Sequence, residues 1–98
     1  MTDPEMTKLC AEAMGYPLVE VDGLRVWCGI NFAHDIFDPL HDDAQAMALV
    51  KKFGMNLCKN REETQWYASI RGGSAWDADL NRAIVKCVAK MQSGKALA

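Results

Sequence analysis

Residues 37–54 read FDPLHDDAQAMALVKKFG, and this stretch encodes a complete helix with its start and stop signals. A proline precedes it, and Gly54 ends it because glycine readily adopts the left-handed conformation found after a helix. Asp42 and Asp43 place negative charge near the positive end of the helix dipole, and two lysines in the last turn place positive charge near its negative end. The pattern predicts a helix over residues 42–53.

The apolar residues of this helix recur at three- and four-residue spacing, which is typical of one buried face. The predicted inner stripe consists of Ala46, Met47, Val50 and Phe53, with Leu49 widening it. Similar spacing predicts a helix over residues 4–14 and another over residues 77–91. The stripe of the last helix consists of Leu80, Ala83, Ile84, Cys87, Val88 and Met91. Residues 92–98 are expected to fray.

A first pair of strands is predicted after the first helix. The dipeptide Asp-Gly at 22–23 is a strong two-residue turn signal between β-type segments. Closing a hairpin there places Glu20 opposite Arg25, with favourable charges. Residues 29–40 are then expected to form an apolar connection to the middle helix.

A second pair of strands is predicted after the middle helix, at residues 55–59 and 64–71. Polar and apolar side chains alternate in the latter segment, as in a half-buried strand. The double glycine at 72–73 ends it. The element order is therefore α-β-β-α-β-β-α, and it predicts a single α+β domain over residues 1–98 with one antiparallel four-stranded sheet covered by helices.

The composition is that of a small globular domain. The chain has 98 residues, half of them hydrophobic, and its formal net charge is -2. That charge argues against binding DNA or RNA through phosphates. No apolar run approaches the roughly 20 residues of a membrane span. The first residues lack the basic and apolar regions of a signal peptide, so we expect a cytoplasmic protein that binds neither nucleic acid nor membrane.

Four cysteines lie far apart in the sequence, at positions 10, 28, 58 and 87. The spacings of zinc ribbons and of thioredoxin-like motifs are therefore absent. Each cysteine falls at an apolar position of a predicted element. We expect buried free thiols that act as small hydrophobic residues, and no catalytic residue is indicated.

Three stretches of the chain carry a family resemblance. They are the end of the first helix at 13–15, the segment 37–46 with its aromatic, Asp-Pro-Leu and Asp-Asp elements, and the segment 79–85, which reads DLNRAIV. Together they resemble the phage ABA-sandwich domain, a family of small proteins encoded by tailed bacteriophages and prophages. The resemblance implies a three-layer α/β arrangement and a viral origin. It implies no activity.

Residues 34–43 hold the densest group of side chains able to bind a metal ion. Imidazole and carboxylate groups from His34, Asp38 and His41 are ligands suited to zinc, manganese or iron. The alternative is structural, with Asp38 organising the turn before Pro39. We favour the structural interpretation and expect no metal and no cofactor.

A glycine-containing turn is the second candidate site, and its residues are Arg71, Gly72, Gly73, Ser74 and the neighbouring Trp76. It lies between the last predicted strand and the start of the last predicted helix, where backbone N–H groups and the helix dipole favour an anion. Arg71 could contact a phosphate with two parallel hydrogen bonds. A flexible turn with an exposed arginine is the simpler interpretation.

Aromatic residues could form a stacking platform, and the set consists of Trp27, Trp66, Trp76 and Tyr67. In a domain of this size such residues more often belong to the core or its rim. Trp76, beside the double glycine, is the one we expect to be exposed.

These observations favour a non-enzymatic accessory protein of phage or prophage origin that acts by binding. Its partner would be a small anionic ligand such as a nucleotide-like signal, or a host protein, in the manner of an anti-defence factor. Self-association is also expected, because a small sheet and three helices leave apolar surface uncovered. A small metal-dependent enzyme using residues 34–43 and a purely structural subunit are the alternatives.

Overall fold

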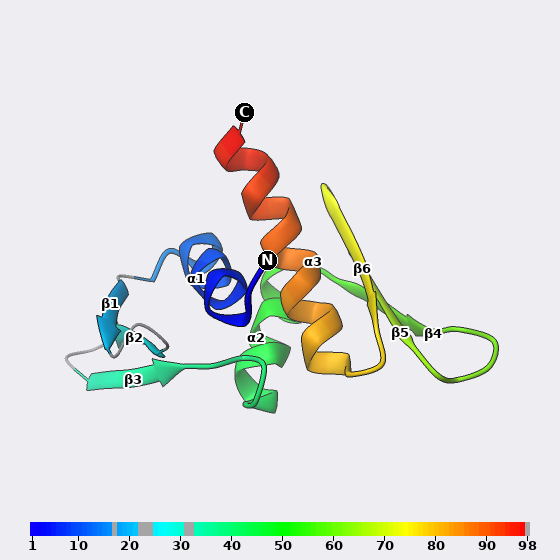
Figure 1. The fold of residues 1–98 in the computed structure, drawn as a ribbon, viewed down its shortest axis with the longest axis horizontal. Helices are drawn as coiled ribbons and strands as arrows, with labels where there is room; N and C mark the ends of the chain where they lie inside the picture. The colour runs from blue at the N-terminus through cyan, green and yellow to red at the C-terminus, as the bar shows by residue number, and fades with distance from the viewer. Residues whose placement is uncertain (17, 22–24, 31–32, 98) are drawn as a thin grey trace.

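The computed structural model describes residues 1–16, 18–21, 25–30 and 33–97, and their arrangement is α+β (Figure 1). In chain order the elements are α1 (Asp3–Met14), β1 (Leu18–Val21), β2 (Arg25–Ile30), β3 (Ala33–Phe37), α2 (Asp43–Phe53), β4 (Asn56–Lys59), β5 (Trp66–Ile70), β6 (Gly73–Asp77) and α3 (Leu80–Leu97). Each of the first two helices is therefore followed by three strands.

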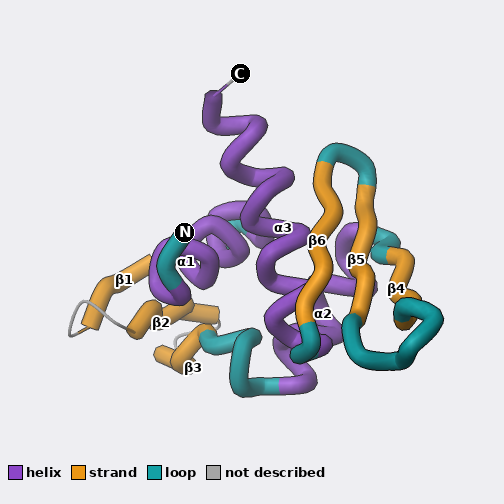
Figure 2. Tube along the Cα trace, turned by 45° about the vertical axis from the view of Figure 1, so that its right-hand side comes forward, coloured by secondary structure: helices purple, strands orange, loops and turns teal. Residues whose placement is uncertain are grey.

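The strands form two separate antiparallel sheets within the described residues, with orders β1-β2-β3 and β4-β5-β6. The two sheets lie on opposite sides of the helices (Figures 1 and 2). The single four-stranded sheet predicted from the sequence is therefore wrong, and the three-layer arrangement implied by the resemblance is not confirmed. The error arises from two strands that the sequence pattern did not indicate.

The first missed strand is β3, which occupies part of the predicted connection over residues 29–40. Its sequence, AHDIF, carries adjacent polar residues and lacks the alternation that identifies a strand. It is held instead by pairing with β2, where Trp27 lies opposite Ile36 and Gly29 opposite His34. Pairing with a neighbouring strand, rather than the intrinsic propensity of its own residues, makes such a segment a strand.

The second missed strand is β6, which begins at the glycine expected to end the second sheet. Residues 71 and 72 form a tight turn, and Ile70 then pairs with Gly73. Gly72 has a φ of 95°, a conformation that suits glycine. The last helix consequently begins at Leu80 rather than at Asp77, and it continues past the predicted end to Leu97.

The register of the first hairpin also differs from the prediction. Val21 pairs with Arg25 and Glu20 with Val26, so three residues rather than two separate the paired ends. Three-residue hairpin connections are the next most common after two-residue turns. The predicted pairing of Glu20 with Arg25 is wrong by one position, and the Asp-Gly dipeptide itself lies outside the described residues.

Two helices begin at a polar cap. Thr2 caps α1 by accepting a hydrogen bond from the backbone N–H of Glu5, whose side chain reaches back to the N–H of Thr2. Asp42 caps α2 by accepting from the N–H of Gln45 at 3.1 Å. The prediction for the middle helix is confirmed, with Gly54 in the left-handed conformation at its end.

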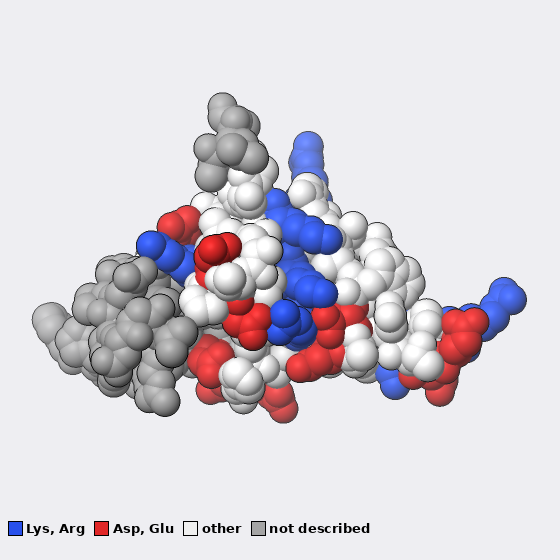
Figure 3. All heavy atoms as spheres, in the orientation of Figure 1, with Lys and Arg blue, Asp and Glu red and all other residues white. Residues whose placement is uncertain are grey.

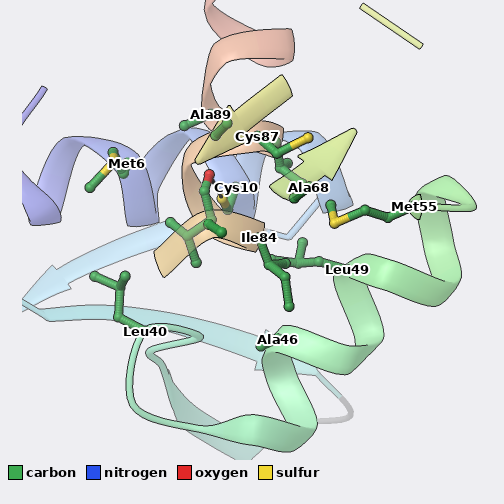
Figure 4. Close-up of a cluster of buried hydrophobic side chains, with 14 of the residues drawn as sticks. Met6, Cys10, Leu40, Ala46, Leu49, Met55, Ala68, Ile84, Cys87 and Ala89 are labelled. Atoms are coloured by element: carbon green, nitrogen blue, oxygen red, sulfur yellow. Dashed lines mark hydrogen bonds between the residues drawn. The ribbon is translucent and has the colours of Figure 1, made fainter. Parts of the chain in front are cut away.

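Helix α3 is the centre of the structure. It contacts α1, α2, β5 and β6, and it lies between α1 and the second sheet in both views (Figures 1 and 2). Its predicted stripe is buried apart from Leu80, and Val85 and Ala89 are buried as well because more than one side of the helix is covered. Figure 4 shows side chains from α1, α2, α3 and β5 meeting in this core. Among the described helices, none is both long enough and apolar enough to cross a membrane.

Candidate anion-binding cleft

A cleft of about 260 Å³ opens beside α3. It is lined by Met1, Met6, Trp76, Arg82, Lys86 and Lys90. In Figure 3 the basic side chains form a column on the surface between α1 and β6. Three cations and an aromatic residue therefore share one hollow in a protein whose formal net charge is -2.

The three cations are brought together by helix periodicity. Arg82, Lys86 and Lys90 recur every four residues, and such residues lie above one another on one face of a helix. Each step rises roughly 6 Å along the axis. The neighbouring residues of α3 are buried in the core, so this basic face is the part of the helix that is left for solvent.

Trp76 borders the cleft from β6, with its ring on the face of the sheet that points away from α3. It is 48% exposed, as expected from the sequence, and lies opposite Tyr67 across the β5–β6 pair. The two ring centroids are 4.6 Å apart with an interplanar angle of 35°. Packing against Tyr67 holds the indole in place, while nearly half of the residue remains accessible.

Two carboxylates neutralise the positive charge at the Arg82 end of the basic column. Asp3 accepts from Arg82 Nη1 at 2.9 Å, which ties the start of α1 to α3. Asp77 Oδ2 accepts from Lys86 Nζ at 2.7 Å and lies 3.4 Å from Arg82 Nε. Lys86 Nζ also lies 3.5 Å from the carbonyl oxygen of Trp76.

The environment of Asp77 favours its charged form. Burial by itself would raise the pKa of this carboxyl group. Hydrogen bonds from Lys86 and from the backbone N–H of Asp79, with the charges of Lys86 and Arg82, together outweigh burial and hold the pKa below its ordinary value. Asp77 is therefore a permanent counter-anion for two of the three cations at neutral pH.

Lys90 differs from the other two cations. It is exposed, and within the part of the chain that the structure describes it forms no ion pair. The cleft therefore has a compensated end at Arg82 and an open cationic end at Lys90.

The glycine-containing turn predicted from the sequence lies elsewhere. Arg71 and Gly72 form the turn of the β5–β6 hairpin, Gly73 and Ser74 begin β6, and the rest of that strand lies between them and the start of α3. The expected placement at a helix start is wrong. Of the five predicted residues, Trp76 lines the cleft and the four residues 71–74 do not.

The cations of the cleft were not singled out from the sequence. Their spacing of four residues was the available signal, but it becomes informative only when β6 and α1 are known to border that face. The expected segment 77–91 already contained all three residues, with no partner element assigned to their side of the helix.

The metal candidates are only partly brought together. Nδ1 of His41 lies 2.9 Å from Oδ2 of Asp38, and both side chains are exposed. Asp42 is occupied as the cap of α2. The side chain of His34 lies outside what the structure describes. Among the described side chains, no group of three or more His, Cys, Asp or Glu residues is placed to hold a metal ion.

The cysteines divide into two kinds. Cys10 and Cys87 are buried, as predicted, and burial raises the pKa of Cys10 to about 12 and of Cys87 to about 11. Cys58 is exposed on β4, so the prediction of a buried thiol is wrong there. The side chain of Cys28 is outside the described part. Neither buried thiol is a nucleophile at neutral pH.

A second hollow lies between α2 and the start of α3, with a volume of about 400 Å³. Its lining consists of Asp43, Ala46, Met47, Asp79, Leu80, Asn81 and Ile84. The rim is acidic and the floor is apolar, so this groove has the opposite charge character to the cleft.

Comparison with models of known protein families, with curated proteins and with solved structures finds no match.

Proposed function

We propose that this protein acts by binding a small anionic ligand in the cleft beside α3, and that it is not an enzyme. The observation that carries the proposal is the convergence of Arg82, Lys86 and Lys90 around one hollow. Cations recognise anionic oxygens such as those of a phosphate group.

The size and charge of the surface favour a small ligand over a polymer. The cleft volume of about 260 Å³ is slightly below the usual range of about 300–1,000 Å³ for small-molecule sites. Acidic residues flank the basic column, and the whole chain carries a net charge of -2. A long polyanion would meet those acids, whereas a compact anion would not.

The biological setting is proposed from the family resemblance alone. A phage or prophage accessory protein that sequesters a nucleotide-like signal in the host cytoplasm would need a binding site and no catalytic group. The basic cleft beside α3 supports the first requirement.

Thermal unfolding with added anions tests the proposal. A ligand at 100 times its dissociation constant adds about 2.7 kcal/mol to the free energy of unfolding, so the melting temperature should rise. Lys90→Glu should abolish the rise because it reverses the open cationic end of the cleft. Lys51→Glu is the matched control, since Lys51 is exposed on α2 away from the cleft lining. Equal ligand response in both variants would refute the proposal.

A second candidate function is binding of a host protein through the groove between α2 and α3. The specific observation is Met47, which is 42% exposed beside the acidic rim formed by Asp43 and Asp79. Exposed methionine adapts to varied apolar partners, and helix grooves accept amphipathic helices. The fitting occupant is a basic amphipathic helix.

Fluorescence anisotropy tests the groove with a synthetic Lys/Leu amphipathic helix and its Glu/Leu counterpart. The basic peptide should bind and Met47→Asp should weaken it, while light scattering reports any self-association. If the acidic peptide binds equally well, the groove is not a site that selects basic amphipathic helices.

A further inference from the structure

Strand β6 lies at one edge of the second sheet, and among the described residues no strand pairs with its outer side. Ile70 pairs with Gly73 across a two-residue turn, so these two residues exchange both backbone hydrogen bonds. Bonding positions alternate along an antiparallel pair, and the N–H and C=O groups of Ser74 and Trp76 therefore point away from β5. This edge presents backbone donors and acceptors to an additional strand.

The outer edge of β6 opens into the cleft beside α3. Lys86 Nζ lies 3.5 Å from the carbonyl oxygen of Trp76, at the long limit of a hydrogen bond. A Cβ atom on Gly73 would lie 3.2 Å from the backbone nitrogen of Met91. The start of β6 therefore lies beside a later part of α3 than its end does, so the strand and the helix run in opposite directions. Lys90 consequently stands toward the start of this edge.

The alternation of β6 dictates which side chains an added strand would carry. Gly73, Ala75 and Asp77 are on the face toward α3, where they contact that helix or are buried. The ring of Trp76 packs on Tyr67 at the opposite face. In an added strand, the residue opposite Ala75 would point toward the basic column, and its two neighbours would point outward beside the indole. One acidic residue between two apolar residues fits this arrangement.

The charge at the edge selects the kind of partner. Asp3 and Asp77 pair with two of the three cations, whereas Lys90 is exposed and forms no ion pair within the described part of the chain. One further carboxylate completes the column. A second copy of the chain paired through β6 would bring two basic columns together, and like charges across neighbouring strands are destabilising. The edge therefore fits an acidic partner better than a second copy.

We infer that the cleft receives an extended segment of another polypeptide, which adds a strand to β6 and places one carboxylate beside Lys90. Main-chain hydrogen bonds to Ser74 and Trp76 supply affinity, and the alternating side chains supply specificity. The carbonyl oxygen of Trp76 exchanges its long contact with Lys86 for an N–H of the added strand. The inference rests on the proposed function, because the carboxylate is the anionic group bound in the same cleft.

Amide hydrogen exchange, followed by NMR on the full chain, tests the assignment. The probe is the peptide Thr-Val-Glu-Val-Thr with acetylated and amidated ends. At saturation the N–H groups of Ser74 and Trp76 should exchange at least about tenfold more slowly, because they become bonded only in the complex. The N–H of Leu57, on the opposite edge of the sheet, should be unchanged.

Peptide methylation provides a matched chemical control. The two valine N–H groups face β6 in the proposed pairing, and the glutamate N–H faces away from it. Methylating both valine nitrogens should abolish the protection of Ser74 and Trp76. Methylating the glutamate nitrogen should leave it in place.

Two variants connect binding to the residues, with isothermal titration as the measurement. Ser74→Pro removes an N–H that points away from β5, and proline is tolerated on an edge strand. This variant should lose the peptide and keep the binding of inorganic phosphate. Lys90→Glu should lose both, and it should bind the peptide with lysine in place of glutamate at least about tenfold more tightly than the original. Melting temperatures verify that both variants fold.

The outcomes separate this inference from the proposed function. If neither the peptide nor inorganic phosphate binds through Lys90, both fail. If phosphate binds through Lys90 but the peptide leaves the amides of Ser74 and Trp76 unprotected, or Ser74→Pro binds the peptide as tightly as the natural chain, the cleft remains an anion site and the strand pairing is overturned. Protection of these amides that rises with protein concentration alone would place a second copy on the edge and would also overturn the inference.

Discussion

A Cβ atom placed on Gly73 would lie 2.6 Å from the carbonyl oxygen of Cys87, so β6 meets α3 where no side chain fits. The same atom would lie 3.2 Å from the backbone nitrogen of Met91. Both neighbours are backbone atoms of the central helix and cannot turn away. This contact sets the distance between the sheet and the helix and thereby the width of the cleft.

Gly73→Ala should therefore destabilise the protein. Overpacking against a rigid neighbour costs about 1–3 kcal/mol, and chemical denaturation should show the loss in the free energy of unfolding. Gly94→Ala is the matched control, because nothing lies within 4 Å of its added Cβ and alanine favours a helix. The control should be neutral or slightly stabilising. An unchanged stability of Gly73→Ala would show that β6 and α3 can separate at no cost.

Glu63 is the non-glycine residue with a positive φ among those described, at 58°. It lies in the β4–β5 connection, where Asn60 accepts hydrogen bonds from the N–H groups of Thr64 and Gln65. The left-handed conformation costs an ordinary residue roughly 1–2 kcal/mol. Glu63→Gly should therefore raise the free energy of unfolding by about 0.5–1 kcal/mol after the entropic cost of glycine is subtracted.

The neighbouring substitution Glu62→Gly should have the opposite sign. Its side chain accepts from Asn60 Nδ2 at 3.2 Å, and that bond would be lost. Two glycine substitutions, one residue apart, would then change stability in opposite directions. Destabilisation by Glu63→Gly would contradict the left-handed assignment.

Asp77 should contribute to the pH dependence of stability. Because its pKa in the folded protein is below the ordinary 3.8, its contribution is present above that pH and is lost as the pH falls through the folded-state pKa. Asp77→Asn should reduce the decline in melting temperature as the pH falls below about 4. Glu12→Gln, at an exposed position of α1, is the control and should keep the wild-type decline.

The thiols should react at very different rates. At about pH 8 the buried Cys10 and Cys87 remain protonated, whereas Cys58 is exposed to reagent. Alkylation by iodoacetamide, followed site by site with mass spectrometry, should modify Cys58 at least about tenfold faster than either buried thiol. Comparable labelling of Cys10 in the folded protein would contradict its burial.

The sequence predicts the three helices well because each carries an apolar stripe that does not depend on distant residues. The strands β3 and β6 were missed because their pairing energy comes from partner strands, and their own residues are weak strand formers. Predicting the cleft from the sequence would likewise require knowing how the strands pair. Arg82, Lys86 and Lys90 are local in sequence, but the wall formed by β6 exists only because this strand follows the hairpin turn.

The middle helix shows how far a periodic pattern can be trusted. The predicted stripe placed Met47 inside and Leu49 at its margin. The structure reverses these positions, with Leu49 fully buried and Met47 42% exposed. Both residues fit the three- and four-residue spacing, and only the direction of α3 decides which of them faces the core (Figure 4).

Leu49→Ala and Met47→Ala should therefore differ sharply in stability. Truncating a fully buried leucine removes contacts and leaves a cavity beside α3, at a cost of about 2–5 kcal/mol. Truncating the exposed methionine should change the free energy of unfolding by less than about 0.5 kcal/mol, as for surface sites in general. Urea denaturation of the two variants measures the difference directly. Similar losses would mean that Met47 is covered in solution, which would favour self-association or a bound partner at the α2–α3 groove.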